Sequence, residues 1–285
     1  MARRAMAVGL LLACVFPAIG AFAPASLALA PLAQGSNPAT QDARDLKTVV
    51  ESGVLRVALT SFNLPAFHRR VDGQWAGPEI DLARQIATAL GVKVEFVDTA
   101  QSFNGVVDLI DAGKADIGIS KLSQTHARLR RVRFSQPYVT LRHAFLFDRA
   151  AISARSGGRA PEDVLRPFDG RIGVIRGSSY VDFAKSNFPR AQVVEMKDWD
   201  TAIAALLDHG VDAIYRDEFE IRRIPKGRPS LNVNFGAAIM LDQKDVLSVA
   251  ICDSCLKLQE FINFHLSKPQ TMFAIRTLLA SDLQN

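Results

Sequence analysis

The stretch ADIGISKLSQTHARLRRVRFSQPY, residues 115–138, decides the fold. Its first part, 115–120, alternates small and apolar side chains and predicts a short buried strand. The strand ends in polar residues, and residues 126–131 then predict a basic helical turn. Because a helix start offers free N–H groups and a positive dipole end, this junction favours a carboxylate or phosphate. Arg128 adds a planar donor that matches a carboxylate.

The composition is typical of a folded protein with one or two domains. The chain has 285 residues, of which 48% are hydrophobic and 22% charged, so it is long enough to bury a substantial core. The formal net charge is +5, but Lys and Arg are scattered, and no basic stripe is interleaved with aromatic residues. A nucleic-acid partner is therefore not expected. The five histidines lack ligand spacing, so neither a metal nor a cofactor is expected.

Residues 1–30 predict a secretory signal peptide. Two arginines precede an apolar run at 5–23, and small residues follow it. Residues 31–45 are then expected to form a disordered lead-in. We therefore expect an exported protein. Lipid attachment at Cys14 is the less favoured alternative, because the residues after it stay apolar.

The mature chain keeps two cysteines, Cys252 and Cys255, in the spacing Cys-Asp-Ser-Cys. An oxidising compartment allows a disulfide between them. The same spacing occurs in redox sites, but a thioredoxin-like site needs a βαβ context that the remaining sequence does not supply. A structural or incidental pair is the favoured interpretation, and its state is left open.

Two parts of the chain repeat one order of elements. LIDAGKADI (109–117) predicts a helix end, a Gly stop and an Asp-led strand, and LLDHGVDAI (206–214) repeats this order. Two α/β lobes of like construction imply a cleft where the C-terminal ends of their strands face each other. The predicted strands are 54–59, 92–97, 116–120, 141–147, 171–175, 192–196, 211–215, 231–235, 237–241 and 246–251. The predicted helices are 78–90, 102–112, 180–187, 198–209, 254–266 and 270–283, and 151–160 is predicted to be a loop.

Motifs in this chain resemble those of the periplasmic solute-binding proteins of the polar amino acid type, bacterial extracellular solute-binding family 3. SKLSQTHAR (120–128) is similar to the family's Ser/Thr-rich segment with its Arg, and FSQPY (134–138) is similar to its Phe-Ser-x-Pro-Tyr box. The resemblance covers about residues 46–264. Further matching segments are GPEIDLA (77–83), LGVKVEF (90–96), GRIGV (170–174), GSSY (177–180) and GVDAI (210–214) with Asp217.

This resemblance implies an α/β protein with the two-lobed periplasmic binding protein type II fold and a ligand cleft between the lobes. Residues 46–142 and 236–285 would form lobe 1, and residues 143–235 would form lobe 2. The chain would be the periplasmic substrate-binding component of an ABC importer. It would bind a small zwitterionic solute, an amino acid or a related carboxylate, by hinge closure. Its partners would be this small-molecule ligand and an ABC permease, and it would be a monomer.

The resemblance also implies a set of ligand-binding residues. The ligand's α-carboxylate would lie on Arg128, with help from Ser123 and, across the cleft, from Ser179. Its α-ammonium would lie on Asp217, and pairing both charges agrees with the high cost of an unpaired buried charge. Each position also has a structural interpretation, such as a helix cap for Asp217. The full expected set is Phe62, Phe103, Ser120, Lys121, Ser123, Arg128, Ser179 and Asp217.

Lys121 departs from the family pattern, in which a small residue is typical at this position. A lysine that points into the cleft favours a ligand with a second anionic group, such as an acidic amino acid or a dicarboxylate. A lysine that points outward says nothing about the ligand. The sequence leaves its direction open.

The sequence predicts no enzymatic activity, because no paired carboxylates and no nucleophile with a histidine can be read from it. Two alternatives to the importer component stay open. One is a dehydratase-like enzyme on the same scaffold, with Lys121, Asp217 and Glu218 as acid and base. The other is an accessory periplasmic binding subunit of another exported system. The identity of the ligand and the site of signal cleavage are left open.

Overall fold

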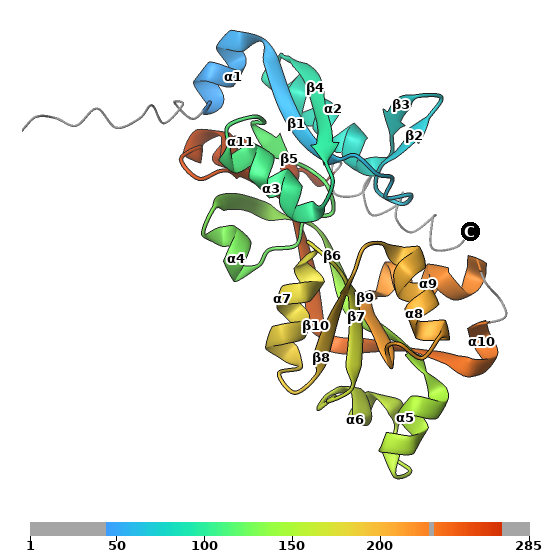
Figure 1. The fold of residues 1–285 in the computed structure, drawn as a ribbon. Coiled ribbons are helices and arrows are strands. Elements are labelled where there is room, and N and C mark those ends of the chain that lie inside the picture. The colour runs from blue at the N-terminus through green and yellow to red at the C-terminus, as the bar shows by residue number, and fades with distance from the viewer. Residues whose placement is uncertain (1–43, 228–230, 270–285) are drawn as a thin grey trace, which may run out of the picture. The chain divides into compact units, whose positions relative to one another are not determined.

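The computed structural model describes residues 44–227 and 231–269 (Figure 1). Within them, an eight-stranded sheet has the strand order β4-β1-β5-β10-β6-β9-β7-β8, and β2 and β3 form a separate hairpin. The strands are β1 (Val54–Thr60), β2 (Arg69–Val71), β3 (Gln74–Ala76), β4 (Lys93–Ala100), β5 (Ile117–Gly118), β6 (Val132–Asp148), β7 (Arg171–Ile175), β8 (Gln192–Met196), β9 (Ala213–Asp217) and β10 (Phe235–Cys252). With the helices around it, this sheet confirms the predicted α/β class.

Two long antiparallel strands, β6 and β10, form the centre of the sheet (Figure 1). They have 17 and 18 residues, and their pairing reaches from Phe235 to Cys252 with interruptions. The register shifts between Met240 and Lys244, which marks a bulge. The strands predicted at 237–241 and 246–251 are therefore one strand, because the pairing with β6 resumes beyond the bulge.

The helices match the sequence prediction best where both ends carry local signals. They are α1 (Leu46–Ser52), α2 (Pro78–Leu90), α3 (Phe103–Asp111), α4 (His126–Leu129), α5 (Arg149–Ser156), α6 (Pro161–Leu165), α7 (Ser179–Asn187), α8 (Trp199–Leu207), α9 (Glu218–Gly227), α10 (Leu231–Asn234) and α11 (Leu256–Leu266). The bounds of α2 are those predicted. Pro78 fits the first helical position, and Gly91 ends the helix in the left-handed conformation.

Two predictions of local structure are wrong. Residues 151–160 are predicted to be a loop, but most of them lie in α5. Asp148 caps this helix by accepting hydrogen bonds from two N–H groups of its first turn. The strand predicted at 231–235 is instead α10 followed by the start of β10. The predicted helix at 270–283 and the predicted signal peptide lie outside the described residues.

Buried apolar side chains divide into separate clusters along the sheet. The largest draws on residues 49–141 and 247–266, together with Phe219. Two others draw on residues 144–240. We call the part around the first cluster lobe 1 and the part around the other two lobe 2. The boundaries predicted at 142/143 and 235/236 stay a prediction.

Parallel strands bring polar residues of both lobes toward one place. In lobe 1, β1 pairs in parallel with β4 and β5. In lobe 2, β7 pairs in parallel with β8 and β9. Ligands of open α/β sheets bind beyond the C-terminal ends of such strands. Lys121 follows β5, Ser179 follows β7 and Asp217 ends β9, so all three stand at positions suited to a binding site.

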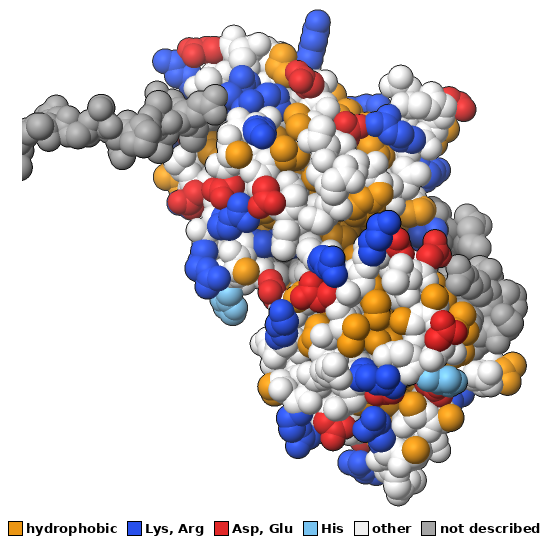
Figure 2. Space-filling view, viewed as in Figure 1, with side chains coloured by type: hydrophobic (Ala, Val, Ile, Leu, Met, Phe, Trp, Pro, Cys, Tyr) orange, Lys and Arg blue, Asp and Glu red, His pale blue; other side chains and the backbone are white. Residues whose placement is uncertain are grey.

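Charged side chains of both signs mix on the face shown in Figure 2. Lys and Arg lie there beside Asp and Glu. Among the described residues on this face, the net positive charge is therefore not gathered into one patch. A mixed surface of this kind does not steer a polyanion to one place.

Gly77, directly before α2, has a backbone conformation whose importance for stability can be tested. Its backbone angles, φ 124° and ψ 172°, lie in a region open essentially to glycine alone. A Cβ atom there would lie 2.6 Å from the carbonyl oxygen of Phe67. We predict that Gly77→Ala lowers the free energy of unfolding by about 3 kcal/mol, as the backbone strain and the clash combine. Urea denaturation measures this loss.

Gly73→Ala is the matched control. Gly73 also has a positive φ, 77°, but a Cβ atom there meets nothing within 4 Å. The free energy of unfolding of Gly73→Ala should fall by about 1 kcal/mol, from the backbone strain alone. Equal losses in the two variants would contradict the role of the Phe67 carbonyl.

Candidate functional site

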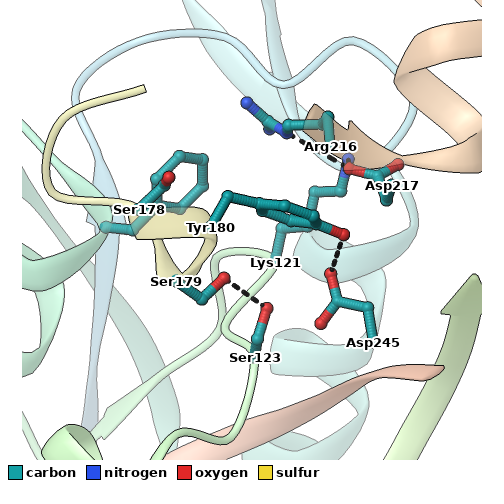
Figure 3. A pocket seen from close by; sticks show the side chains of 9 residues that line it. Lys121, Ser123, Ser178, Ser179, Tyr180, Arg216, Asp217 and Asp245 are labelled. Atoms are coloured by element: carbon teal, nitrogen blue, oxygen red, sulfur yellow. Dashed lines mark hydrogen bonds and ion pairs between the residues drawn. The ribbon is translucent and has the colours of Figure 1, made fainter. Parts of the chain in front are cut away.

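A cavity lies where the strand ends of the two lobes meet (Figure 3). The space between its lining atoms, open solvent included, is about 220 Å³, and the side chains leave only about 10 Å³ of it with room for water. Its lining combines hydroxyl groups, two carboxyl groups and two cations with two aromatic rings. The lining residues are Phe103, Lys121, Ser123, Ser178, Ser179, Tyr180, Arg216, Asp217 and Asp245.

Five of the eight residues expected from the sequence line this cavity. They are Phe103, Lys121, Ser123, Ser179 and Asp217. The other three, Phe62, Ser120 and Arg128, do not line it. Phe62 and Arg128 contact residues that do, and Ser120 directly precedes one in the sequence. Their role in ligand binding stays a prediction.

Phe62 and Ser120 support the cavity from lobe 1. The ring of Phe62 packs edge-on against that of Phe103, with 5.8 Å between the centroids. The Ser120 hydroxyl accepts a hydrogen bond from the Thr60 N–H and donates one to the Thr60 hydroxyl, both at 3.1 Å. Ser120 therefore joins the end of β1 to the turn that follows β5.

Arg128 is buried beside the cavity. Its Nε and Nη2 atoms donate to Oδ1 of Asn104, at 3.1 and 3.0 Å, and its Nη1 atom donates to the Ser123 carbonyl at 3.0 Å. Burial lowers the pKa of Arg128 to about 10, against the attraction of Asp245 and Asp182. The guanidinium is therefore still charged at neutral pH. The described contacts use three of its five N–H groups.

Lys121 points into the cavity, which settles the direction that the sequence left open. Its Nζ atom lies 2.9 Å from Oδ2 of Asp217 and 3.1 Å from Oε1 of Glu220. The lysine side chain is 2% exposed and that of Asp217 is fully buried. Two carboxylates of lobe 2 therefore already balance the charge of Lys121. The preference for a second anionic group, which assumed a free lysine, stays a prediction.

Asp217 is both a helix cap and a member of the site. Its Oδ1 atom accepts a hydrogen bond from the N–H of Glu220 in the first turn of α9, at 3.1 Å. Its Oδ2 atom accepts one from Nε of Arg216 at 3.2 Å. Burial favours the neutral acid, but the positive charges of Lys121 and Arg216 outweigh it and lower the pKa of Asp217. The carboxylate is therefore ionised at neutral pH.

Contacts between the lobes close the cavity. The Ser179 hydroxyl, at the start of α7, donates to the Ser123 hydroxyl at 2.8 Å (Figure 3). The N–H of Asn104 donates to the Gly177 carbonyl at 3.0 Å. The first N–H groups of a helix have no partner within the helix, so the start of α7 suits a negatively charged group.

The sequence analysis missed four of the lining residues. The Tyr180 hydroxyl donates to Oδ2 of Asp245 at 2.8 Å. Burial raises the pKa of Asp245, and the nearby charge of Asp217 adds to this effect. Tyr180, Ser178 and Arg216 directly adjoin predicted residues, so a search of neighbouring positions would have found them. Asp245 carries no such signal, because it approaches the cavity through the pairing of β10 with β6.

A buried polar network holds Lys121 in place from behind. The carboxylate of Glu79 accepts hydrogen bonds from the Lys121 N–H, at 2.6 Å, and from the Tyr138 hydroxyl. Its other oxygen contacts Nδ1 of His68 at 2.7 Å. Nε2 of His68 in turn contacts the Thr60 hydroxyl at 3.0 Å. The network ties the end of β1 to the turn after β5 through α2.

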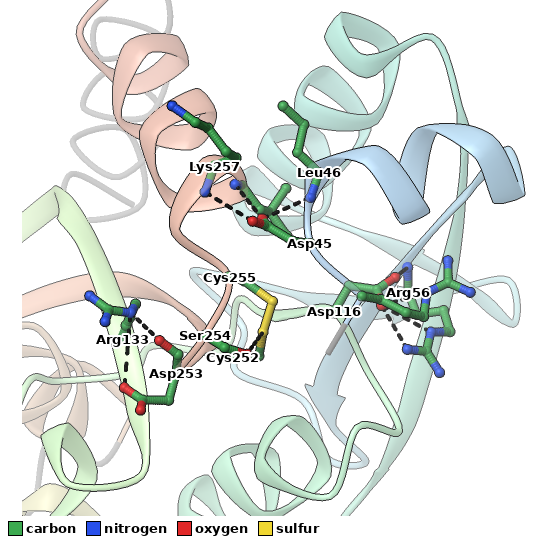
Figure 4. Close-up of a disulfide and its surroundings, with 12 residues drawn as sticks. Asp45, Leu46, Arg56, Asp116, Arg133, Cys252, Asp253, Ser254, Cys255 and Lys257 are labelled. Atoms are coloured by element: carbon green, nitrogen blue, oxygen red, sulfur yellow. Dashed lines mark hydrogen bonds and ion pairs between the residues drawn. A yellow bond between two sulfur atoms is a disulfide. The ribbon is translucent and has the colours of Figure 1, made fainter. Parts of the chain in front are cut away.

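Cys252 and Cys255 form a disulfide away from this cavity (Figure 4). Their Cα atoms are 5.3 Å apart, and the bond joins the end of β10 to the start of α11. The Asp45 carboxylate lies nearby and accepts hydrogen bonds from the N–H groups of Leu46, Lys257 and Leu258. The cysteine pair therefore has a structural position at a helix start.

The comparisons with known proteins assign the family. The sequence model of bacterial extracellular solute-binding proteins, family 3, matches residues 55–220. The chain belongs to this family. Amino acid ABC transporter substrate-binding protein AbpA of Streptococcus pneumoniae, bound to L-arginine, is a similar solved structure. It is 25% identical with a TM-score of 0.67, and the match covers 84% of this chain and 98% of AbpA. The predicted family and two-lobed type II fold are confirmed.

Several curated relatives are named as enzymes. Cyclohexadienyl dehydratase of Pseudomonas aeruginosa is 31% identical over 206 residues, which cover 71% of this chain and 73% of the relative. Membrane-bound lytic murein transglycosylase F of Idiomarina loihiensis is 29% identical over 224 residues, and the match spans 47% of its length. The prediction that this chain has no enzymatic activity is therefore wrong, since enzymes share its domain at about this level of identity.

The family consists of extracellular proteins, in agreement with a location outside the cytoplasmic membrane. In the part of the chain that the structure describes, no helix combines the length and the hydropathy of a membrane span.

The raised pKa of Asp245 predicts a pH dependence of stability. The folded protein keeps this proton at pH values at which the unfolded chain, with a carboxyl pKa near 3.8, has lost it. The contribution of Asp245 to stability therefore falls as the pH rises from that value through the raised pKa. We predict that Asp245→Asn, which cannot ionise, gains thermal stability over the wild type as the pH rises.

Asp242→Asn is the control for this comparison. Arg166 lowers the pKa of the exposed Asp242, so removing its charge should cost stability at neutral pH. Thermal unfolding followed by circular dichroism between about pH 4 and pH 8 measures both variants. A difference between Asp245→Asn and the wild type that stays constant with pH would contradict the prediction.

Proposed function

We propose that the chain captures a small carboxylate solute, an amino acid or a related acid, between its two lobes. The observation that carries this proposal is Arg128, which is buried and still charged. It donates to the Ser123 carbonyl, and the Ser123 hydroxyl accepts a hydrogen bond from Ser179 at the start of α7. A carboxylate placed there would replace the hydrogen bond between Ser123 and Ser179. It would gain the hydroxyl groups of both residues and free N–H groups of α7.

In this proposal the ligand enters and leaves by hinge motion. β6 and β10 run through both lobes, so a bend in these strands would separate Ser179 from Ser123 and Lys121 from Asp217. A ligand that contacts both lobes favours the closed state, because it gains all of its contacts only there. The short distances between the lobes support a structure near the closed state.

The chain would then deliver its solute to an ABC permease as a periplasmic monomer. Family membership and the similarity to an ABC transporter substrate-binding protein support this role. The signal peptide proposed for residues 1–30 would direct the export.

Substitution of Arg128 tests the binding proposal. A thermal-shift screen of the twenty standard amino acids and their 2-oxo acids identifies a ligand, since binding to the folded state raises the midpoint. We predict that Arg128→Ala then weakens binding by about 2–5 kcal/mol in calorimetric titration, because a buried charge contact is lost.

Arg130→Ala is the matched control. Arg130 follows the same short helix but is exposed, so this variant should bind as the wild type does. Circular dichroism checks that both variants are folded. A folded Arg128→Ala protein with unchanged affinity would remove the proposal.

A dehydratase activity is the second candidate function. The relative named cyclohexadienyl dehydratase supports it, and so does Asp245, an acid in the cavity whose pKa burial raises. Such an acid can protonate a leaving hydroxyl group so that it departs as water. Of the groups expected from the sequence, Lys121 and Asp217 are paired with each other, and Glu218 accepts a hydrogen bond from the Arg142 N–H. Asp245 is therefore the better candidate acid.

Incubation with prephenate, a cyclohexadienyl acid, tests this activity. We predict product formation above the rate in buffer, measured by chromatography. Asp245→Asn should reduce the rate by about 100-fold or more, the scale of a lost general acid. Asp242→Asn, on the same strand but exposed, should leave it unchanged. A wild-type rate equal to that in buffer would exclude this candidate.

A further inference from the structure

We propose that Lys121 acts as a built-in ammonium group, and that the cavity therefore prefers small carboxylates without an amino group, such as 2-oxo and 2-hydroxy acids. This inference rests on the proposed function, because it assumes that the cavity binds a carboxylate. It narrows the ligand class by asking which charged groups of the cavity are still available to a ligand.

Lys121 already holds the acceptors that a cationic ligand group would need. Its Nζ atom lies 2.9 Å from Asp217 (Figure 3). It also lies 3.1 Å from Glu220 and 4.8 Å from the centroid of the Phe67 ring. These contacts come from both lobes and surround the ammonium group. An ammonium ion so placed is fully paired in the closed state.

Asp217 has little capacity left for a second cation. One oxygen accepts the N–H of Glu220, and the other is shared by Lys121 and Arg216. Two positive charges therefore already stand against this one carboxylate. An α-ammonium group beside them would add a third positive charge to a buried place, which like-charge repulsion disfavours.

Asp245 does not take the place of Asp217 as a partner for the ammonium group of a ligand. Asp245 accepts the hydroxyl hydrogen of Tyr180, and burial raises its pKa, which favours its neutral form. Among the residues that line the cavity in the described part of the chain, acids are limited to Asp217 and Asp245. The groups left for a ligand are hydroxyls and cations, which suit an anion.

The backbone holds Lys121 in this position. Its φ of 49° lies in the left-handed region, which is uncommon for a residue with a side chain. The hydrogen bond from its N–H to the buried Glu79 supports this conformation. Residues kept in such conformations tend to lie at functional sites. Glycine adopts the same φ without strain, which gives a variant that removes the side chain and leaves the turn intact.

Matched pairs of ligands test the preference directly. Calorimetric titration of the wild-type protein would compare phenylpyruvate with L-phenylalanine, 4-methyl-2-oxopentanoate with L-leucine, and 2-oxoglutarate with L-glutamate. We expect at least one 2-oxo acid to bind at least about tenfold more tightly than its amino acid, a readily measured difference. Equal or tighter binding of the amino acid in every pair that binds would overturn the inference and leave Lys121 as a contact between the lobes.

The Lys121→Gly variant tests whether Lys121 causes the preference for the 2-oxo acid. Without the lysine, Asp217 and Glu220 are free to pair with an α-ammonium group, so the preference should shift toward the amino acid by at least about tenfold. Lys114→Gly, an exposed lysine in a turn, is the control and should keep the wild-type preference. An unchanged preference in folded Lys121→Gly protein would overturn the inference.

Different results would contradict the proposed function and the inference about Lys121. If neither member of any pair, nor any acid of the thermal-shift screen, binds to the wild type, the proposed function fails and the inference fails with it. If ligands bind without the expected preference, the inference alone fails.

Discussion

The ion pair of Lys121 with Asp217 is the contact on which the site depends. It joins the turn after β5 in lobe 1 to the end of β9 in lobe 2, and neither side chain has appreciable contact with water. Removing two charges from water is costly, so such a pair persists only where further hydrogen bonds satisfy both groups. Glu220 satisfies the lysine, and Arg216 and the start of α9 satisfy the aspartate.

The same desolvation cost limits how strongly this pair holds the lobes together. If the lobes separate, both charges regain water, which offsets much of the attraction that is lost. A closed structure held by such contacts can therefore open without a large change in free energy. In the proposed mechanism, a ligand that contacts both lobes would shift this balance toward the closed state.

The sequence predicts those parts of the structure whose signals are local. The bounds of α2 follow from Pro78 and Gly91, and Lys121 and Asp217 can be located because each stands beside the end of a recognisable strand. Asp245 could not be found this way, since its place in the cavity depends on how β10 pairs with β6 beyond a bulge. The ion pair itself was also out of reach, because it joins residues from different lobes.

The order of the strands has a consequence for how the chain matures. β10 lies between β5 and β6 in the sheet, and residues 247–266 complete the core of lobe 1. These residues leave the ribosome only after the whole of lobe 2. The synthesis of lobe 1 thus starts first and is completed last. Most of lobe 2 is one continuous segment, which can fold as a unit.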